Sequence, residues 1–212
     1  MPEEINRVVT DHISNYLFAP TTAAREYLLR EGAPDETIHV TGNTIVDEVF
    51  QNIEIAKRPG DVLSKFGLAK GNYFLVTAHR AENVDDQSRL EGIIYGLQAI
   101  GKEFDLPVIF PIHPRTQKML STFGISTDGI QIIHPVGFFE FLQLEANAHL
   151  VLTDSGGVQE ETCILGVPCV THRENIERPE TIEVGSNVLA GTDAGRDWYG
   201  GWKDAGITAG IG

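Results

Sequence analysis

Apolar and polar positions divide most of the chain into short apolar runs, each followed by a segment with helical spacing. The apolar runs are rich in Val, Ile and Phe, and turn residues bound them, as is typical of buried strands. They occupy residues 38–42, 73–79, 106–113, 130–136, 149–154 and 167–172. Strands that are apolar on both faces and alternate with helices predict an α/β fold with a doubly wound parallel sheet.

The helical segments between these runs carry their own start and stop signals. The clearest has an apolar stripe at Leu90, Ile93, Ile94, Leu97 and Ile100. Gly101 is expected to end this helix, because glycine commonly follows the last helical turn. Pro114 and Pro179 each fit the first position of a further helix, and Gly185 is expected to end the second of these.

The two ends of the chain differ from this middle part. Residues 1–45 predict two helices and one or two short strands, which cannot bury a core alone. We therefore expect them to pack on the main sheet or to be the remnant of an N-terminal domain, joined to the rest by a helix that ends near residue 58. Residues 59–193 are the predicted main domain, and the glycine-rich residues 194–212 are read as a tail.

Composition and charge exclude several classes of function. A chain of 212 residues with 42% hydrophobic content can bury a substantial core. The net charge of −14 argues against nonspecific binding to nucleic acid or to an anionic membrane. No apolar run approaches the roughly 18 residues of a membrane span, and the polar N-terminus is unlike a secretory signal, so the expected compartment is the cytoplasm.

The two cysteines do not predict a metal site. Cys163 and Cys169 lack a CxxC or CxxH partner, and we expect them to be buried free thiols.

Candidate chemistry gathers where the predicted strands end, because ligands of open parallel sheets bind at that edge. His79, His113 and His134 each close a strand. A single histidine at a strand end is more often structural, and we expect this of His134. The polar residues that follow His79 in the segment "HRAEN" make it the strongest candidate for a functional histidine.

The turn Asp154-Ser155-Gly156-Gly157 follows another strand and opens a helix. Its uncovered amide groups and the positive end of the helix dipole favour an anion such as phosphate. Ser155 can add its hydroxyl or cap the helix. The alternative is a simple helix start with glycines for close packing.

Two side chains beyond this turn extend the pattern. Glu161 lies four residues after Gly157, so its carboxylate should hang on the face that carries the anion site and accept hydrogen bonds from a ribose diol. Phosphate together with ribose means a nucleotide. Arg178 precedes Pro179 and could neutralise a diphosphate or form a surface ion pair. We expect the cluster Phe138, Phe139 and Phe141 to be core, with one ring free to face a base.

Together these residues and their motifs resemble a known family, the non-hydrolysing UDP-N-acetylglucosamine 2-epimerases. The resemblance runs from residue 2 to about residue 193. It is carried by "PEEINR", "TGNTIVD", "VTAHRAENVDD", "TDSGGVQEE", "LGVPCV" and "ERPETIEVGSNVLAGTD".

The resemblance implies a GT-B-type two-domain fold whose C-terminal Rossmann-like domain holds most of the UDP. Family members interconvert UDP-GlcNAc and UDP-ManNAc by eliminating UDP to 2-acetamidoglucal and adding it back, without a metal or nicotinamide. It also implies a role in polysaccharide biosynthesis and a homodimer for the full-length protein.

By the same resemblance, roles pass to individual residues. Glu3 and His79 correspond to catalytic residues. The UDP-binding positions are Ser155, Gly156 and Gly157 at the phosphates, Glu161 at the ribose, Val136 and Phe141 at the base, Arg178 near the phosphates, and His113 at a neighbouring strand end.

The chain departs from the family pattern because the family's first half, with a diphosphate-binding arginine and two further catalytic acids, precedes the part that resembles it. We therefore expect weak UDP binding and poor epimerisation by this chain alone. The alternatives are a hydrolysing epimerase that releases ManNAc and UDP, the donor half of a GT-B glycosyltransferase, and a non-catalytic UDP-sugar-binding fragment.

Overall fold

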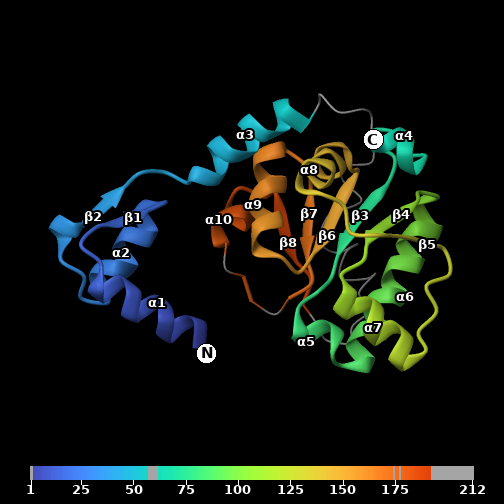
Figure 1. Ribbon diagram of the computed structural model, residues 1–212, viewed down its shortest axis with the longest axis horizontal. Coiled ribbons are helices and arrows are strands. Elements are labelled where there is room, and N and C mark those ends of the chain that lie inside the picture. Colours follow the sequence, from blue (N-terminus) through green and yellow to red (C-terminus); the bar gives the residue numbers. More distant parts are fainter. Residues whose placement is uncertain (1, 57–61, 174, 177, 192–212) are drawn as a thin grey trace. The chain divides into compact units, whose positions relative to one another are not determined.

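The computed structural model of the protein describes residues 2–56, 62–173, 175–176 and 178–191, and the side chains of residues 2 and 3 lie outside that description. The described residues form two compact units that divide between Phe50 and Gln51, within helix α3 (Thr44–Ala56) (Figure 1). Each unit has its own parallel sheet. The expected glycine-rich tail, residues 194–212, lies outside the described residues.

The first unit is a small βαβ arrangement beside a further helix. Its elements are α1 (Pro2–Ile13), β1 (Leu17–Ala19), α2 (Thr22–Arg30), the 3₁₀ turn η1 (Asp35–Thr37) and β2 (Ile38–Val40). The two strands run parallel with Leu17 opposite Ile38, and one side of this ribbon is buried against α2. Large apolar side chains remain exposed elsewhere in the unit, among them Ile5 and Ile13 on α1 and Phe18 on β1.

Arg7 ties α1 to the end of α2. Its Nη1 and Nη2 atoms donate to Oε2 and Oε1 of Glu31 at 2.9 and 2.6 Å, and Glu31 is the residue that ends α2. The same guanidinium donates to Glu4 and Asp11 within α1. A planar guanidinium suits such paired bonds to one carboxylate, so Arg7 fixes the crossing of the two helices.

The second unit is built on a parallel sheet, as the apolar runs predict. Six strands of the described chain pair in the order β5-β4-β3-β6-β7-β8. Their bounds are β3 (Phe74–Thr77), β4 (Val108–Pro111), β5 (Ile130–Ile133), β6 (Leu150–Thr153), β7 (Cys169–Thr171) and β8 (Asn187–Leu189). The chain moves outward from β3 in one direction and from β6 in the other. Such a reversal of strand order creates a topological switch point between β3 and β6.

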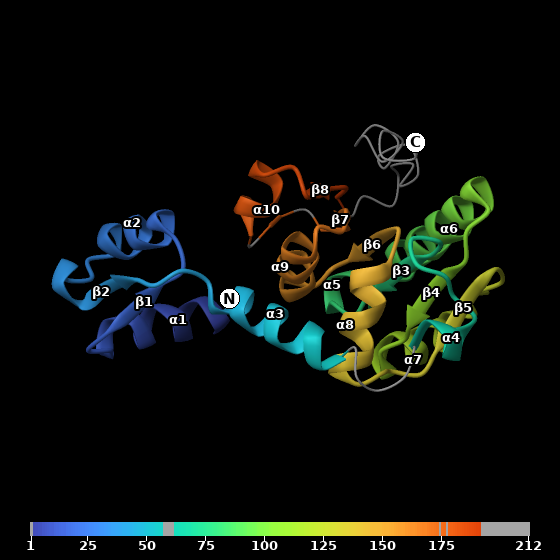
Figure 2. The same cartoon turned by 90° about the horizontal axis from the view of Figure 1, so that it is seen from above.

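Helices cover both faces of this sheet, which confirms the doubly wound α/β architecture (Figures 1 and 2). One apolar cluster includes Ile93 and Leu97 of α6 and Leu120 of α7, and the other includes Leu144 of α8 and Val158 of α9. The helices of this unit are α4 (Val62–Phe66), α5 (Ala81–Val84), α6 (Gln87–Phe104), α7 (Pro114–Phe123), α8 (Phe138–Asn147), α9 (Gly156–Leu165) and α10 (Pro179–Glu183). In the parts of the chain covered here, no helix is both long and apolar enough to cross a membrane.

Helix α6 continues past Gly101, where the sequence pattern predicted its end. It stops at Phe104, and Asp105 takes the left-handed conformation with φ of 52°. Gly101 is a packing position: a Cβ atom there would lie 2.9 Å from Cγ2 of Val108 on β4. The glycine therefore allows α6 to approach the sheet closely rather than ending the helix.

Gly101→Ala should destabilise the second unit. The added methyl must displace a buried, β-branched side chain, and overpacking of this kind costs about 1–3 kcal/mol, more than the roughly 1 kcal/mol that alanine gains over glycine in a helix. Thermal unfolding of the variant and the wild type measures the difference. An unchanged or raised melting temperature would contradict the assignment of Gly101 as a close-packing position.

Candidate functional site

The candidate site lies at the switch point, where the first turns after β3 and β6 face each other. His79 follows β3, and Ser155 follows β6. The two strands are hydrogen-bonded neighbours with Thr77 opposite Thr153, so their carboxyl ends lie side by side. The Oγ1 atoms of these two threonines are 2.6 Å apart and form a hydrogen bond between the two strands.

A pocket of about 450 Å³ opens at this edge of the sheet. Side chains and backbone that follow β3, β4, β5 and β6 line it. Five residues predicted from the sequence are among them: His79, His113, Val136, Phe141 and Ser155. The structure thus brings together predicted residues that lie up to 76 positions apart in the chain, His79 and Ser155.

His79 is held by a buried carboxylate. Its Nδ1 atom is 2.9 Å from Oδ1 of Asp154, whose side chain is completely buried, while the imidazole itself is 42% exposed. With Nδ1–H donated to Asp154, Nε2 is the ring nitrogen left for a ligand. A histidine oriented in this way can donate to or accept a proton from a group bound in the pocket.

Asp154 is the centre of a wider network, a role that sequence reasoning did not assign. Its Oδ2 atom accepts from the backbone N–H groups of His79 and Arg80 at 2.9 and 2.8 Å and from Nδ2 of Asn83 at 3.2 Å. Burial alone would raise the pKa of Asp154, but His79, the neighbouring His172 and the Arg80 amide outweigh it and hold that pKa well below its usual range. Asp154 is therefore ionised and fixes the loop after β3. Its place at the end of the buried strand Leu150–Thr153 was the available signal.

His113 stands opposite His79 with a different local role. It caps α7, where its Nδ1 atom accepts from the Arg115 amide at 3.2 Å. The centroids of the two imidazole rings are 5.9 Å apart. Arg115, the second residue of α7, pairs with Asp85, which follows α5. His113 thus faces the pocket from the β4 side.

The start of α9 forms a further side of the pocket, next to the residues that follow β3 and β4. Ser155 is its N-cap residue but makes no capping bond with its side chain, so the hydroxyl is not used to hold the helix. The Ser155 amide donates to Oγ1 of Thr153 at 2.9 Å, which fixes the turn. The next amide groups have no partner inside a helix and carry the positive end of its dipole.

Gly157 is not required by the packing of the protein. A Cβ atom built there would meet nothing closer than Oγ of Ser155 at 4.0 Å, and its backbone does not need positive φ. The alternative that both glycines serve close packing is therefore not supported at this position. The space beside the Gly157 amide is open on the side of Ser155, which lines the pocket.

Glu161 and Arg178 lie outside the set of residues that line the pocket. Glu161 is partly exposed on α9, one turn beyond Val158. Arg178 precedes α10, and its Nε atom lies 2.8 Å from Oε2 of the nearly buried Glu160. The ion-pair alternative for Arg178 is thus realised, and the pair joins the start of α10 to α9.

The predicted aromatic core is wrong for two of its three members. Phe138 and Phe139 are exposed at the start of α8 and contact each other edge to face, with ring centroids 5.6 Å apart. Helix α8 begins at Phe138, so both rings lie in its first turn, ahead of the buried residues from Leu142 onward. Phe141 is partly buried and lines the pocket.

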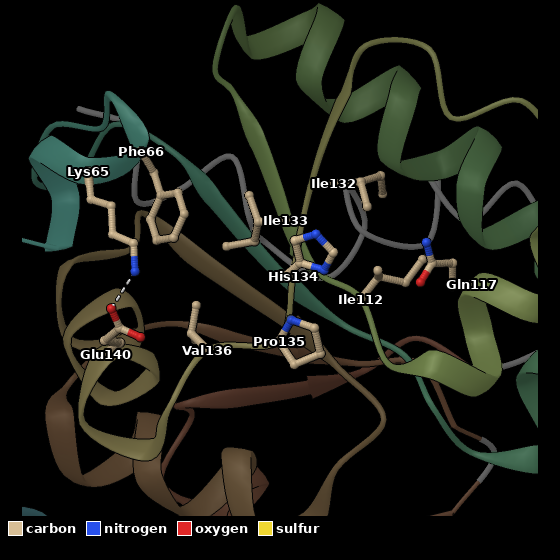
Figure 3. A pocket seen from close by; sticks show the side chains of 10 residues that line it. All are labelled: Lys65, Phe66, Ile112, Gln117, Ile132, Ile133, His134, Pro135, Val136 and Glu140. Carbon is tan, nitrogen blue, oxygen red and sulfur yellow. Dashed lines mark hydrogen bonds and ion pairs between the residues drawn. The ribbon is translucent and has the colours of Figure 1, made fainter.

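A second pocket of about 560 Å³ shares Pro135 and Val136 with the first. Figure 3 shows Phe66 and the Lys65–Glu140 ion pair, with 2.6 Å between Nζ and Oε1, on one side of it. His134 lines this second pocket and is not among the lining residues of the first. The structure therefore does not join His134 to the other two histidines of the sheet edge.

Possible metal ligands do not cluster within the described chain. Among its residues, no group of three or more His, Cys, Asp or Glu side chains could hold a metal ion. Cys163 and Cys169 are free, as predicted, with Cys169 buried and Cys163 partly buried. The backbone of Glu3 lies in the first turn of α1, but its side chain is outside the description, so its predicted catalytic role is untested.

Comparison with known proteins identifies close relatives of the chain. The family model described as UDP-N-acetylglucosamine 2-epimerase matches residues 1–196. The UDP-N-acetylglucosamine 2-epimerase of Methanocaldococcus jannaschii is 56% identical over 198 residues, which cover 90% of this chain and 54% of that protein. The enzyme of the same name from Methanococcus maripaludis is 54% identical over 91% of this chain and 55% of its own length.

The fold agrees with a solved structure of the first relative. The crystal structure of the Methanocaldococcus jannaschii UDP-GlcNAc 2-epimerase in complex with UDP-GlcNAc and UDP matches with a TM-score of 0.86 and 53% identity, covering 97% of this chain and 58% of that one. The chain thus spans about half the length of the curated relatives it matches.

Proposed function

Because the chain belongs to the UDP-N-acetylglucosamine 2-epimerase family, we propose that its pocket binds the UDP part of a nucleotide sugar and that the whole protein interconverts UDP-GlcNAc and UDP-ManNAc. The observation that carries the proposal is the meeting of His79 with the start of α9 in one pocket. The UDP-binding domain would comprise residues 59–193.

The start of α9 is the proposed phosphate site. Its leading amides, the unused Ser155 hydroxyl and the open space beside Gly157 give a diphosphate donors and room to approach. A net charge of −14 disfavours an anion at long range, so the attraction must arise from these local groups. Arg178, proposed near the phosphates by resemblance, is half exposed and already paired with Glu160, which leaves it a secondary role.

The nucleoside would extend from the phosphate site along two elements. Phe141 and the backbone at Val136 line the pocket at the end of β5 and the start of α8, and they are proposed to meet the base. Glu161, one turn along α9, is proposed to accept hydrogen bonds from the ribose hydroxyls. This arrangement gives each part of UDP a separate partner.

His79 is the proposed donor to the departing diphosphate. In the expected reaction a base removes the proton at C2, the C1–O bond breaks, and UDP leaves with that bonding pair while C1 and C2 become doubly bonded. Protonation of C2 from the other face and return of UDP to C1 complete the inversion. With a proton on both ring nitrogens, His79 would donate Nδ1–H to Asp154 and Nε2–H to the diphosphate, and so stabilise the negative charge that develops there. Glu3 is proposed as one catalytic carboxylate on resemblance alone.

The length of the chain favours a second candidate, binding without turnover. The chain spans about half the length of these relatives, and the resemblance implies that two further catalytic acids belong to the family's first half. UDP binding needs only residues of the second unit, whereas epimerisation needs more. Homodimerisation of the full-length protein stays a prediction from the resemblance.

Calorimetric titration and a product assay test these proposals in sequence. We expect UDP to bind the 212-residue chain more tightly than UMP, because the second phosphate gains donors at α9. We expect little UDP-ManNAc, and little solvent deuterium at C2, when the chain is incubated with UDP-GlcNAc in D₂O. Failure of UDP to bind at millimolar concentration would contradict the proposed site, robust epimerisation would contradict binding without turnover, and free ManNAc would identify the hydrolysing reaction.

A further inference from the structure

Glu145 is a buried acid that is not among the residues of the proposed UDP site. It lies in the last turn of α8, and its side chain is completely buried. Neither of its carboxylate oxygens accepts a hydrogen bond from an N–H or O–H group of the described residues. A fully buried glutamate without a donor is rare, because burying an unpaired charge costs several kcal/mol. Such a group holds a proton instead.

The neighbour of Glu145 is the carboxyl group of Glu161. Helix α8 packs against α9, and this interface places the carboxyl group of Glu161 beside the buried Glu145. Burial first, and then the charge of Glu161, raise the pKa of Glu145 well above its usual range. Two carboxyl groups so close hold one proton between them, and the fully buried member keeps it.

Among the described residues, the other titratable groups around Glu145 do not offer it a positive charge. On β7 the nearest is Cys169, whose thiol is neutral because burial raises its pKa to about 12. On α4, which also packs against α8, Lys65 pairs with Glu140 at the opposite end of α8. Glu161 on α9 is therefore the partner that decides the state of Glu145.

We propose that Glu145 is a positioning residue: as a neutral acid it donates its O–H to Glu161 and holds that carboxylate in the orientation that receives a ribose diol. The inference rests on the proposed function, since the ribose role of Glu161 is itself proposed. A carboxylate has about four lone-pair positions, so it can accept from a neighbouring acid and from a diol at the same time. An ionised Glu145 would instead repel Glu161 and release it toward solvent.

The test compares UDP with 2′-deoxy-UDP, because their difference reports the contact to the diol. Wild type should bind UDP about tenfold more tightly than 2′-deoxy-UDP, the effect of one hydrogen bond to a charged group. Glu145→Gln keeps a donor and should keep the preference. Glu145→Met fills a similar volume without a donor and should reduce the preference to about twofold or less. Glu91→Gln, an exposed change on α6, is the matched control and should leave it unchanged.

The pH profile separates positioning from a purely structural role. In wild type the preference for UDP should fall as the pH rises through the folded pKa of Glu145, whereas Glu145→Gln should keep it constant. The stability of the wild type should also fall as the pH rises. A neutral buried carboxyl contributes stability that is fully present below the unfolded pKa, about 4.3, and is lost as the pH rises. Glu145→Gln should therefore melt higher than wild type at pH 8 and not near pH 4.

Three results would overturn the inference. The first is a Glu145→Met variant that prefers UDP over 2′-deoxy-UDP as strongly as wild type does. The second is a Glu145→Gln variant that loses this preference as fully as Glu145→Met. The third is wild-type protein that binds UDP and 2′-deoxy-UDP equally well, which would leave UDP binding itself in place. Failure of wild type to bind UDP at all is a separate outcome that overturns the proposed function as well. If Glu145→Met does not fold, the preference and pH profile of Glu145→Gln against wild type still decide the question.

Discussion

Replacing Asp154 with Asn should destabilise the protein by about 3 kcal/mol, the cost of breaking a buried charged hydrogen-bond network. The wild-type carboxylate accepts from two backbone amides, from Asn83 and from the His79 ring. An asparagine side chain has one acceptor oxygen and points an NH₂ group at donors that need an acceptor. The melting temperature should fall by roughly 10 °C, since 1 kcal/mol corresponds to a few degrees for a domain of this size.

The pH dependence of this effect has a definite sign. Because the folded pKa of Asp154 is depressed, the stability from its ionised form is present above the unfolded pKa, about 3.9, and is lost as the pH falls through the folded pKa. The difference between wild type and Asp154→Asn should thus be largest near neutral pH and shrink in acid. Asp86→Asn is the control: this exposed N-cap residue accepts from the Arg89 amide, and its change should cost less than about 1 kcal/mol. Equal losses in the two variants would contradict the central role of Asp154.

Gly157→Ala should lower the affinity for UDP by roughly 10- to 100-fold, the equivalent of losing a charged hydrogen bond of about 1.5–3 kcal/mol. The methyl group would occupy the open space beside Ser155, where a phosphate oxygen would otherwise approach the amides of α9. The fold should not suffer, because outside the adjacent residues and the backbone of α9 no protein atom lies closer than 4.0 Å to the new Cβ. Alanine should instead raise stability, by up to about 1 kcal/mol. Calorimetry with UDP and thermal unfolding measure the two effects.

Gly101→Ala is the natural counterpart of this variant. The chemical change is identical, but the added methyl meets Val108 in the core instead of the pocket. It should lose stability and keep UDP affinity, whereas Gly157→Ala should do the reverse. Wild-type affinity in Gly157→Ala would mean that the phosphates do not lie against the start of α9.

Much of the second unit follows from its sequence because its strands are buried on both faces. Apolar runs such as residues 73–79 and 149–154 leave no alternative to interior strands, and a parallel sheet then fixes the edge where ligands bind. The same reasoning places His79, His113 and Ser155 at one edge of the sheet. It missed β8, whose three residues, Asn187–Leu189, are too short for a pattern.

Other features depend on contacts that no local pattern contains. Gly101 looks like a helix end, but it lies within the helix at a position where Val108 leaves no room for a side chain. Glu145 looks like an ordinary polar position in an amphipathic helix, and its burial arises from the packing of α8 on α9. Phe138 and Phe139 look like core residues, and their exposure depends on where α8 begins. Tertiary packing decides each of these cases.

The bonds to Asp154 also bear on when the site can form as the chain folds. The residues that Asp154 holds lie 71 to 75 positions earlier in the chain, on the loop after β3 and in α5. Contacts of such sequence separation incur their loop-closure entropy before they return any stabilisation, so they do not belong to an early local nucleus. The imidazole and the anion turn should come together only when β6 pairs with β3. On the ribosome, a nascent chain would therefore lack affinity for UDP until β6 and α9 had both emerged.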